Sequence, residues 1–141
     1  MTKTPLLLGA LAAGVLAAGA ATAQDVIRIG APLPITGPLS PEAVKQQRGY
    51  DLWAETANKS GGVLVGGKRM KVEIVYVDYQ SNTPRAVQAA EKLITQDKVK
   101  LILGEVASSN SLAMAPKAQE AKVPMITPSS TNVTVTQVGD Y

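Results

Sequence analysis

The stretch VKLILGEVASSNS, residues 99–111, joins a short apolar run to a hydroxyl-rich turn that leads into a helical pattern. The stretch VPMITPSSTN, residues 123–132, repeats this arrangement. A strand that ends in Ser, Thr or Asn before a helix brings unpaired backbone N–H groups and side-chain hydroxyls to one place. The start of a helix also carries partial positive charge, so this place suits a carboxylate or a phosphate. Two such turns on neighbouring strands predict a ligand cleft.

Apolar runs alternate with helical patterns along the rest of the chain. Ser40 and Pro41 are typical of a helix start, with Ser40 as the N-cap, and Thr83-Pro84 opens a further helix. Helix-length connections between apolar strands predict an α/β fold, a parallel sheet with helices on both faces. In such folds the ligand site lies outside the carboxyl ends of the strands, where both hydroxyl-rich turns fall. The predicted strands are residues 26–31, 70–78, 99–103 and 123–127, and the predicted helices follow the first three of them.

Three shorter segments complete this interpretation. The first predicted helix runs to about Asn58, and Trp53 lies at helical spacing with Gly49 and Ala57, which predicts core packing. Residues 63–68 are interpreted as a small surface excursion between the helix and the next strand. The segment VTVT that follows the second hydroxyl-rich turn carries no decisive pattern.

The composition excludes most hydrolase chemistry. The chain contains neither Cys nor His, so it lacks the usual general base, the usual metal ligand and every Ser-His-Asp or Cys-His nucleophile arrangement. No GxGxxG follows the first predicted strand, and no P-loop is present. We therefore expect no enzyme activity, no catalytic residue, no metal site and no cofactor.

The N-terminus is typical of a secretory signal peptide. Lys3 precedes a long apolar stretch that ends in Ala21-Thr22-Ala23, which predicts cleavage after Ala23 and residues 1–23 as the signal. The alternative, a retained membrane anchor, needs roughly 20 predominantly apolar residues and usually lacks a small-x-small exit. Removal of Lys3 lowers the net charge from +3 to +2. The remaining basic residues are scattered and aromatic residues are few, so we expect no nucleic-acid binding.

Four segments of the chain carry a family resemblance, namely VIRIGAPLPITGP (26–38), NKSGGVLVGG (58–67), VDYQSNTPRA (77–86) and PMITPSSTN (124–132). Together they resemble the leucine/branched-chain amino-acid binding protein family, the periplasmic solute receptors of bacterial ABC importers. The resemblance implies a type I periplasmic binding fold of two lobes, with residues 24–141 forming an incomplete N-terminal lobe, so the chain is expected to be a fragment. It also implies a periplasmic location, a small-molecule ligand (an amino acid or related small carboxylate) and an ABC permease of the inner membrane as partner.

The resemblance also implies roles for individual residues of the two turns. Ser108 matches the family's serine that hydrogen-bonds the ligand carboxylate. Ser129 matches a position that contributes backbone groups, and Thr131 matches the threonine that holds carboxylate and ammonium groups. Ser109 and Ser130 complete the candidate set in the turns, with helix capping as the alternative role for these hydroxyls. Neutral hydroxyls and amides can orient a carboxylate without the desolvation cost of a buried cation.

Two acidic residues depart from the family pattern. Glu42 stands where many members have an aromatic residue, and Glu105 stands where Pro or a small residue is common. Glu42 is included among the candidate ligand-binding residues, with a first-turn acid that complements the helix dipole as the alternative. Glu105 is either a charge in the cleft or a solvated loop residue. These departures extend the possible ligands to an aromatic acid, an amide or a polar amino acid.

The sequence leaves three possible functions for this chain. The favoured one is the substrate-binding component of an ABC importer for amino-acid transport. The second is a ligand-sensing domain of an extracellular or periplasmic regulator. The third is a flavodoxin-like enzyme, against which the missing His and Cys argue.

Overall fold

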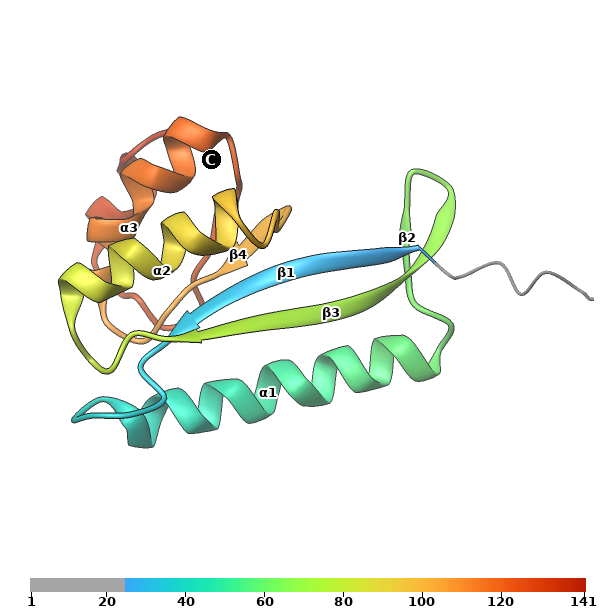
Figure 1. Ribbon diagram of the computed structural model, residues 1–141, viewed down its shortest axis with the longest axis horizontal. Helices are drawn as coiled ribbons and strands as arrows, with labels where there is room; N and C mark the ends of the chain where they lie inside the picture. Colours follow the sequence, from blue (N-terminus) through green and yellow to red (C-terminus); the bar gives the residue numbers. More distant parts are fainter. Residues whose placement is uncertain (1–24) are drawn as a thin grey trace, which may run out of the picture.

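The computed structural model describes residues 25–141, so the predicted signal peptide, residues 1–23, lies outside the described residues. Five strands form one sheet in the order β2-β3-β1-β4-β5 (Figure 1). The strands are β1 (Val26–Leu33), β2 (Val63–Val65), β3 (Lys68–Asp78), β4 (Leu101–Leu103) and β5 (Met125–Ile126). The helices are α1 (Ser40–Lys59), α2 (Thr83–Thr95), α3 (Ser108–Ala121) and the short 3-10 helix η1 (Val133–Gln137). Within the described range, no helix is both long enough and apolar enough to cross a membrane.

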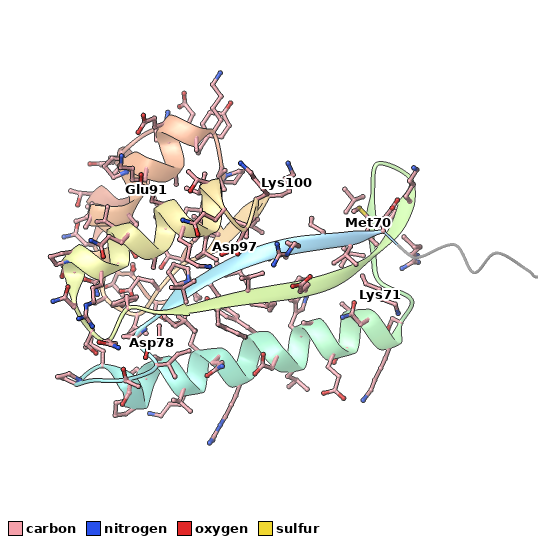
Figure 2. The ribbon with its side chains drawn as sticks, viewed as in Figure 1. Met70, Lys71, Asp78, Glu91, Asp97 and Lys100 are labelled. Carbon is pink, nitrogen blue, oxygen red and sulfur yellow. The ribbon has the colours of Figure 1, made fainter. Side chains whose placement is uncertain are left out.

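Four of the five strands are parallel, as predicted. β1 pairs with β3 from Val26↔Lys71 to Leu33↔Asp78, and on its other side it pairs with β4. β4 in turn pairs with β5. The carboxyl ends of these strands therefore meet at one edge of the sheet (Figure 2), where Asp78 ends β3 beside the start of α1.

The fifth strand corrects the prediction for residues 63–68. This segment is not only a surface excursion, because Val63–Val65 forms β2 and pairs antiparallel with β3. The two strands are joined through Gly66 and Gly67, which have φ angles of 55° and 81°. Such positive φ angles favour glycine and allow a tight hairpin turn.

Helices cover both faces of the sheet, which confirms the predicted layers (Figure 1). On one face α1 packs on the sheet, and Ala31, Leu33 and Ala43 are buried between them. On the other face α2 and α3 pack on the sheet and on each other. Gly30 lets α2 approach closely, because a Cβ at this position would lie 3.1 Å from Leu93 Cδ1. The larger core on this face contains Tyr79, Ala86, Ala89, Ala90, Leu93, Val99, Ile102, Met114 and Ala118.

The outer side of α1 differs from the prediction. Trp53 is 44% exposed and Leu52 is 66% exposed, so the predicted core packing of Trp53 is wrong. The positions of α1 that face the sheet are those of Ala43, Tyr50 and Ala57, and Trp53 lies beside this stripe rather than within it. The prediction that Ser40 is the N-cap of α1 is also wrong. Leu39 is the N-cap and Ser40 is the first helical residue, so the helix begins one residue earlier than predicted.

The loop between β1 and α1 is fixed to the loop that follows β3. The Asp78 carboxylate accepts hydrogen bonds from the Thr36 amide (3.2 Å), the Thr36 hydroxyl (2.7 Å) and the Gln80 amide (2.8 Å). Partial burial alone would raise the pKa of Asp78, but these hydrogen bonds hold it below its usual value. Ser81 adds a further link, since its hydroxyl accepts from the Leu39 amide at 3.1 Å. These bonds give the carboxyl edge of the sheet a defined shape next to the candidate site.

Candidate ligand-binding site

The two hydroxyl-rich turns lie against each other at the carboxyl edge of the sheet, as the sequence predicted. The hydroxyls of Ser111 and Ser130 are 2.6 Å apart, and the Asn132 amide donates to the Ser108 hydroxyl at 3.2 Å. Within the second turn, the Ser130 amide donates to the Thr127 hydroxyl at 3.2 Å. Side chains from both turns therefore form a single hydrogen-bonded surface.

The start of α3 carries no side-chain cap. Its N-cap residue is Ala107, whose side chain makes no capping hydrogen bond, and the Ala107 amide itself donates to the Glu105 carboxylate. The Asn110 and Ser111 amides donate to the Ala107 carbonyl, at 3.0 Å and 3.2 Å, whereas the Ser108 and Ser109 amides have no acceptor among residues 25–141 and are available to an external acceptor. By contrast, α2 is capped by Asn82, whose side chain accepts from the Arg85 amide at 3.1 Å. The structure thus does not support the alternative in which Ser108 caps α3.

The hydroxyls at this helix start keep their donor capacity. Ser108 accepts one hydrogen bond through its oxygen, and its O–H hydrogen has no acceptor among residues 25–141. Ser109 and Thr131 are exposed, and their side chains have no hydrogen-bond partner within the same range. An anion placed at this point would meet hydroxyl donors, backbone N–H groups and the positive end of the helix dipole.

A groove of about 590 Å³ adjoins these turns on the side of α1. Ser129 faces it, and the Ser129 hydroxyl lies 3.5 Å from the side-chain oxygen of Gln46. Glu42 lies on the same groove, but its carboxylate is exposed and pairs with Lys45 at 2.9 Å. The residues that line the groove are Glu42, Lys45, Gln46, Gly49, Tyr50, Val106, Pro128 and Ser129.

Two residues of α1 support the first turn, and the sequence interpretation missed both roles. The Gln46 amide and the Tyr50 hydroxyl both donate to the Gly104 carbonyl, at 2.7 Å and 2.6 Å. Burial raises the pKa of Tyr50, which keeps its hydroxyl protonated as a donor. The i, i+4 spacing of the two residues places them on one helix face and was the signal present in the sequence.

Glu105 lies beneath the first turn and is fully buried, so its interpretation as a solvated loop residue is wrong. Its carboxylate accepts from the Tyr79 hydroxyl and from the Ala107 amide. Asn110 donates to the Tyr79 hydroxyl at 3.0 Å, and Thr83 donates to the Asn110 side-chain oxygen at 2.7 Å. Burial raises the pKa of Glu105, and the amide donors partly oppose this shift.

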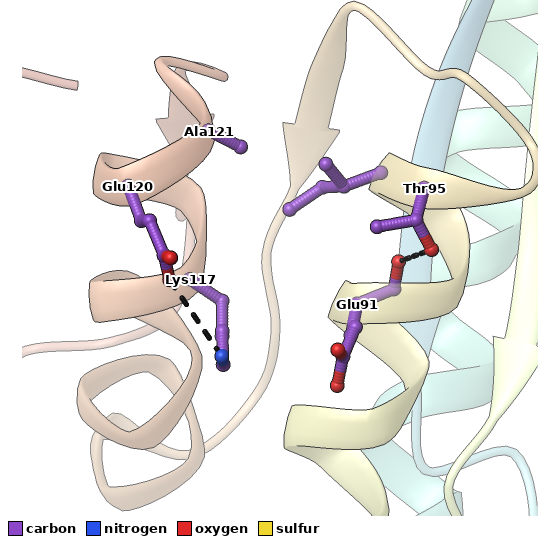
Figure 3. A pocket seen from close by; sticks show the side chains of 6 residues that line it. Glu91, Thr95, Lys117, Glu120 and Ala121 are labelled. Carbon is purple, nitrogen blue, oxygen red and sulfur yellow. Dashed lines mark hydrogen bonds and ion pairs between the residues drawn. The ribbon is translucent and has the colours of Figure 1, made fainter.

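A second hollow, of about 260 Å³, lies between α2 and α3 (Figure 3). Lys117 and Glu120 form an ion pair of 3.6 Å on its α3 side, and the Thr95 hydroxyl bonds the Glu91 carbonyl on its α2 side. These residues belong to the C-terminal halves of the two helices, away from the hydroxyl-rich turns. This hollow therefore lacks the helix N-terminus and the free hydroxyls of the first site.

The fold and its matches define the class of protein. A mostly parallel sheet with helices on both faces and the site at its carboxyl edge is the arrangement of a type I periplasmic binding fold. The chain belongs to the periplasmic binding protein family, whose model matches residues 26–140.

Individual relatives agree with this assignment. The chain is 33% identical over 142 aligned residues to the leucine-, isoleucine-, valine-, threonine-, and alanine-binding protein of Pseudomonas aeruginosa, covering 99% of this chain and 37% of the relative. A leucine binding protein of Thermotoga maritima is 41% identical to the chain, with a TM-score of 0.69. This match covers 80% of the present chain and 30% of the Thermotoga chain. A solute binding protein of an R. palustris ABC transporter, solved in complex with 4-hydroxybenzoate, is 32% identical to the chain, with a TM-score of 0.68. This match covers 80% of the present chain and 29% of the R. palustris chain.

The chain is much shorter than these proteins. It spans 37% of the length of the Pseudomonas relative and 30% and 29% of the two solved structures. What these relatives bind is therefore a property of chains about three times as long.

Proposed function

We propose that the chain belongs to the substrate-binding component of an ABC importer and binds an amino acid or a related small carboxylate. The observation that carries this proposal is the uncapped start of α3, where the Ser108 hydroxyl and backbone N–H groups are available beside the second turn. A helix start without a capping side chain is a suitable partner for a carboxylate. The function involves recognition without reaction, which is consistent with the absence of His and Cys from the sequence.

We assign the ligand contacts within this proposal as follows. Ser108, Ser109 and Thr131 donate hydroxyl or amide hydrogen bonds to the ligand carboxylate. Ser129 contributes from the groove beside α1, and Ser130 holds the second turn against the first through Ser111. Glu42 contributes at the rim of the groove only if the ligand displaces Lys45 from its carboxylate.

Two ligand classes are supported by the relatives' names. The Pseudomonas relative is named for binding leucine, isoleucine, valine, threonine and alanine. The R. palustris neighbour holds 4-hydroxybenzoate, an aromatic acid. Both classes carry a carboxylate, which is the group that the start of α3 suits.

The partner and the location follow from the same proposal. An ABC permease in the inner membrane would receive the ligand, and the protein would act in the periplasm after cleavage of residues 1–23. A ligand-sensing domain of a regulator would use the same site, and it would differ in what is attached to the binding domain. The site alone supports binding in both cases.

A thermal-shift screen tests the proposed function. The complete gene product, without residues 1–23, is heated with leucine, with 4-hydroxybenzoate and with their amides, leucinamide and 4-hydroxybenzamide. We expect one of the acids to raise the melting temperature, because a ligand at about 100 times its Kd stabilises the folded state by roughly 2.7 kcal/mol. The matched amide, which lacks the carboxylate, should give a much smaller rise. No shift with either acid would contradict the proposal for these two ligand classes, as would equal shifts with an acid and its amide.

A further inference from the structure

A chain of hydrogen bonds, buried at Tyr79, Asn110 and Glu105, leads from the start of α2 to the start of α3. The Thr83 hydroxyl donates to the Asn110 side-chain oxygen, and the Asn110 side-chain amide donates to the Tyr79 hydroxyl. The Tyr79 hydroxyl then donates to one oxygen of Glu105, and the Ala107 amide donates to the other. Every donor in this chain points toward the Glu105 carboxylate.

The carboxylate is enclosed in the protein. Glu105 is fully buried, and Tyr79 and Asn110 are 1% and 2% exposed. Removing a charge from water is costly unless donors replace the lost solvent, so these bonds decide where the carboxylate can lie. One of the bonds reaches Ala107, which is the residue directly before α3. The position of the carboxylate is therefore linked to the position of Ser108 and of the first N–H groups of the helix.

We propose that Glu105 is a positioning residue for the ligand site, whose ionised carboxylate holds the Ala107 amide and thereby fixes the start of α3, and that protonation of Glu105 loosens this arrangement. The first part concerns the protein without ligand. The consequence for ligand affinity rests on the proposed function.

The hydrogen-bond pattern explains why protonation matters. Both oxygens of Glu105 already face donors, the Tyr79 hydroxyl and the Ala107 amide. A proton added to either oxygen removes the negative charge, and hydrogen bonds to an ionised acceptor are roughly twice as strong as those to a neutral one. Protonation therefore weakens the hold of Glu105 on the Tyr79 hydroxyl and on the Ala107 amide. The other titratable groups facing Glu105 are the phenols of Tyr79 and, from α1, Tyr50. Phenols ionise near pH 10, so the carboxyl group is the one that titrates in the acidic range.

The sign of the pH effect follows from burial. Burial raises the pKa of Glu105, so the protonated form gains population above the ordinary titration range of a glutamate, near 4.3. As pH falls through this raised pKa, the amide of Ala107 loses its charged acceptor. The affinity for a carboxylate ligand should therefore fall with it.

The test uses the complete gene product without residues 1–23, observed by amide NMR. Without ligand, the amide resonances of Ala107 and Ser108 should titrate together as the pH is lowered from neutrality into the acidic range, and Glu105→Gln should abolish this titration. Tyr79→Phe keeps the carboxyl group but removes one donor, so it should move the midpoint to higher pH. Glu91→Gln, which changes an exposed carboxylate of α2, should leave the titration unchanged.

Leucine affinity, measured by calorimetry over the same pH range, completes the test. Wild type should lose about tenfold or more in affinity at the acidic end, whereas Glu105→Gln should bind weakly at every pH with little pH dependence. Absence of an amide titration at Ala107 in wild type would overturn the positioning role. A clear amide titration with pH-independent leucine affinity would overturn the coupling to the site. If leucine does not bind at any pH, leucine is excluded as the ligand of the proposed function and the coupling proposed for leucine is rejected. The NMR titration still decides whether Glu105 positions the start of α3. If Glu105→Gln does not fold, the wild-type titration and the midpoint shift in Tyr79→Phe decide the matter.

Discussion

Leu93→Ala is expected to lower the free energy of unfolding by about 2–5 kcal/mol, the range found when a buried leucine is truncated and a cavity remains. Leu93 is fully buried on α2 and packs against Gly30 of β1, which has no side chain that could fill the gap. The same core contains Ile102 and Met114, so the loss reaches β4 and α3. Urea unfolding of the complete gene product without residues 1–23 measures the effect.

Leu52→Ala is the matched control for this variant. It removes the same atoms from α1, but Leu52 is 66% exposed, so its change should stay within about 0.5 kcal/mol. Similar losses for both variants would show that α2 is not packed on the sheet as described here.

Ser108→Ala is expected to weaken ligand binding by about 1–3 kcal/mol, or roughly 5- to 150-fold in Kd, because a ligand oxygen loses its hydroxyl donor in the bound state. The free energy of unfolding should change little. Ser108 does not cap α3, and the Asn132 amide that it accepts from is exposed and can bond water instead. Calorimetry with leucine or 4-hydroxybenzoate, whichever acid raises the melting temperature, measures the binding loss.

Two further variants make the result for Ser108 specific. Thr131→Ala should reduce binding by a similar amount, since Thr131 has an exposed hydroxyl in the second turn. Thr95→Ala removes an exposed hydroxyl at the far end of α2, where its one hydrogen bond within residues 25–141 is to the Glu91 carbonyl, and should leave binding unchanged. Equal losses of stability and binding in Ser108→Ala would favour a purely structural role for this hydroxyl.

Local signals predicted the layers of the fold and the meeting of the two turns. The apolar run before Gly104 and the one before Thr127 each form a parallel strand, because β-branched and aliphatic residues between helices have few other places to be buried. Pro84 lies in the first turn of α2, where its missing N–H has no cost. Parallel strands end at the same edge, so the contact between Ser108 and Asn132 follows from topology.

Long-range contacts set the features that the sequence did not predict. Glu105 can be buried because the Tyr79 hydroxyl, from a residue 26 positions earlier in the chain, donates to its carboxylate, and Asn110 of α3 in turn donates to Tyr79. No local pattern specifies such a partner. Tyr50 and Ala57 belong to the one narrow stripe of α1 that faces the sheet. Trp53 lies beside this stripe and is therefore exposed. In both cases the environment of the side chain depends on tertiary packing, which overrides the preference of the residue type.

Amide chemical-shift changes can locate a bound carboxylate ligand, which we expect at the uncapped start of α3. The complete gene product without residues 1–23 is titrated with the acid that raises its melting temperature. We expect the largest changes at the amides of Ser108, Ser109 and residues 129–131. Changes confined to the hollow between α2 and α3, or an absence of changes in both hydroxyl-rich turns, would contradict this expectation.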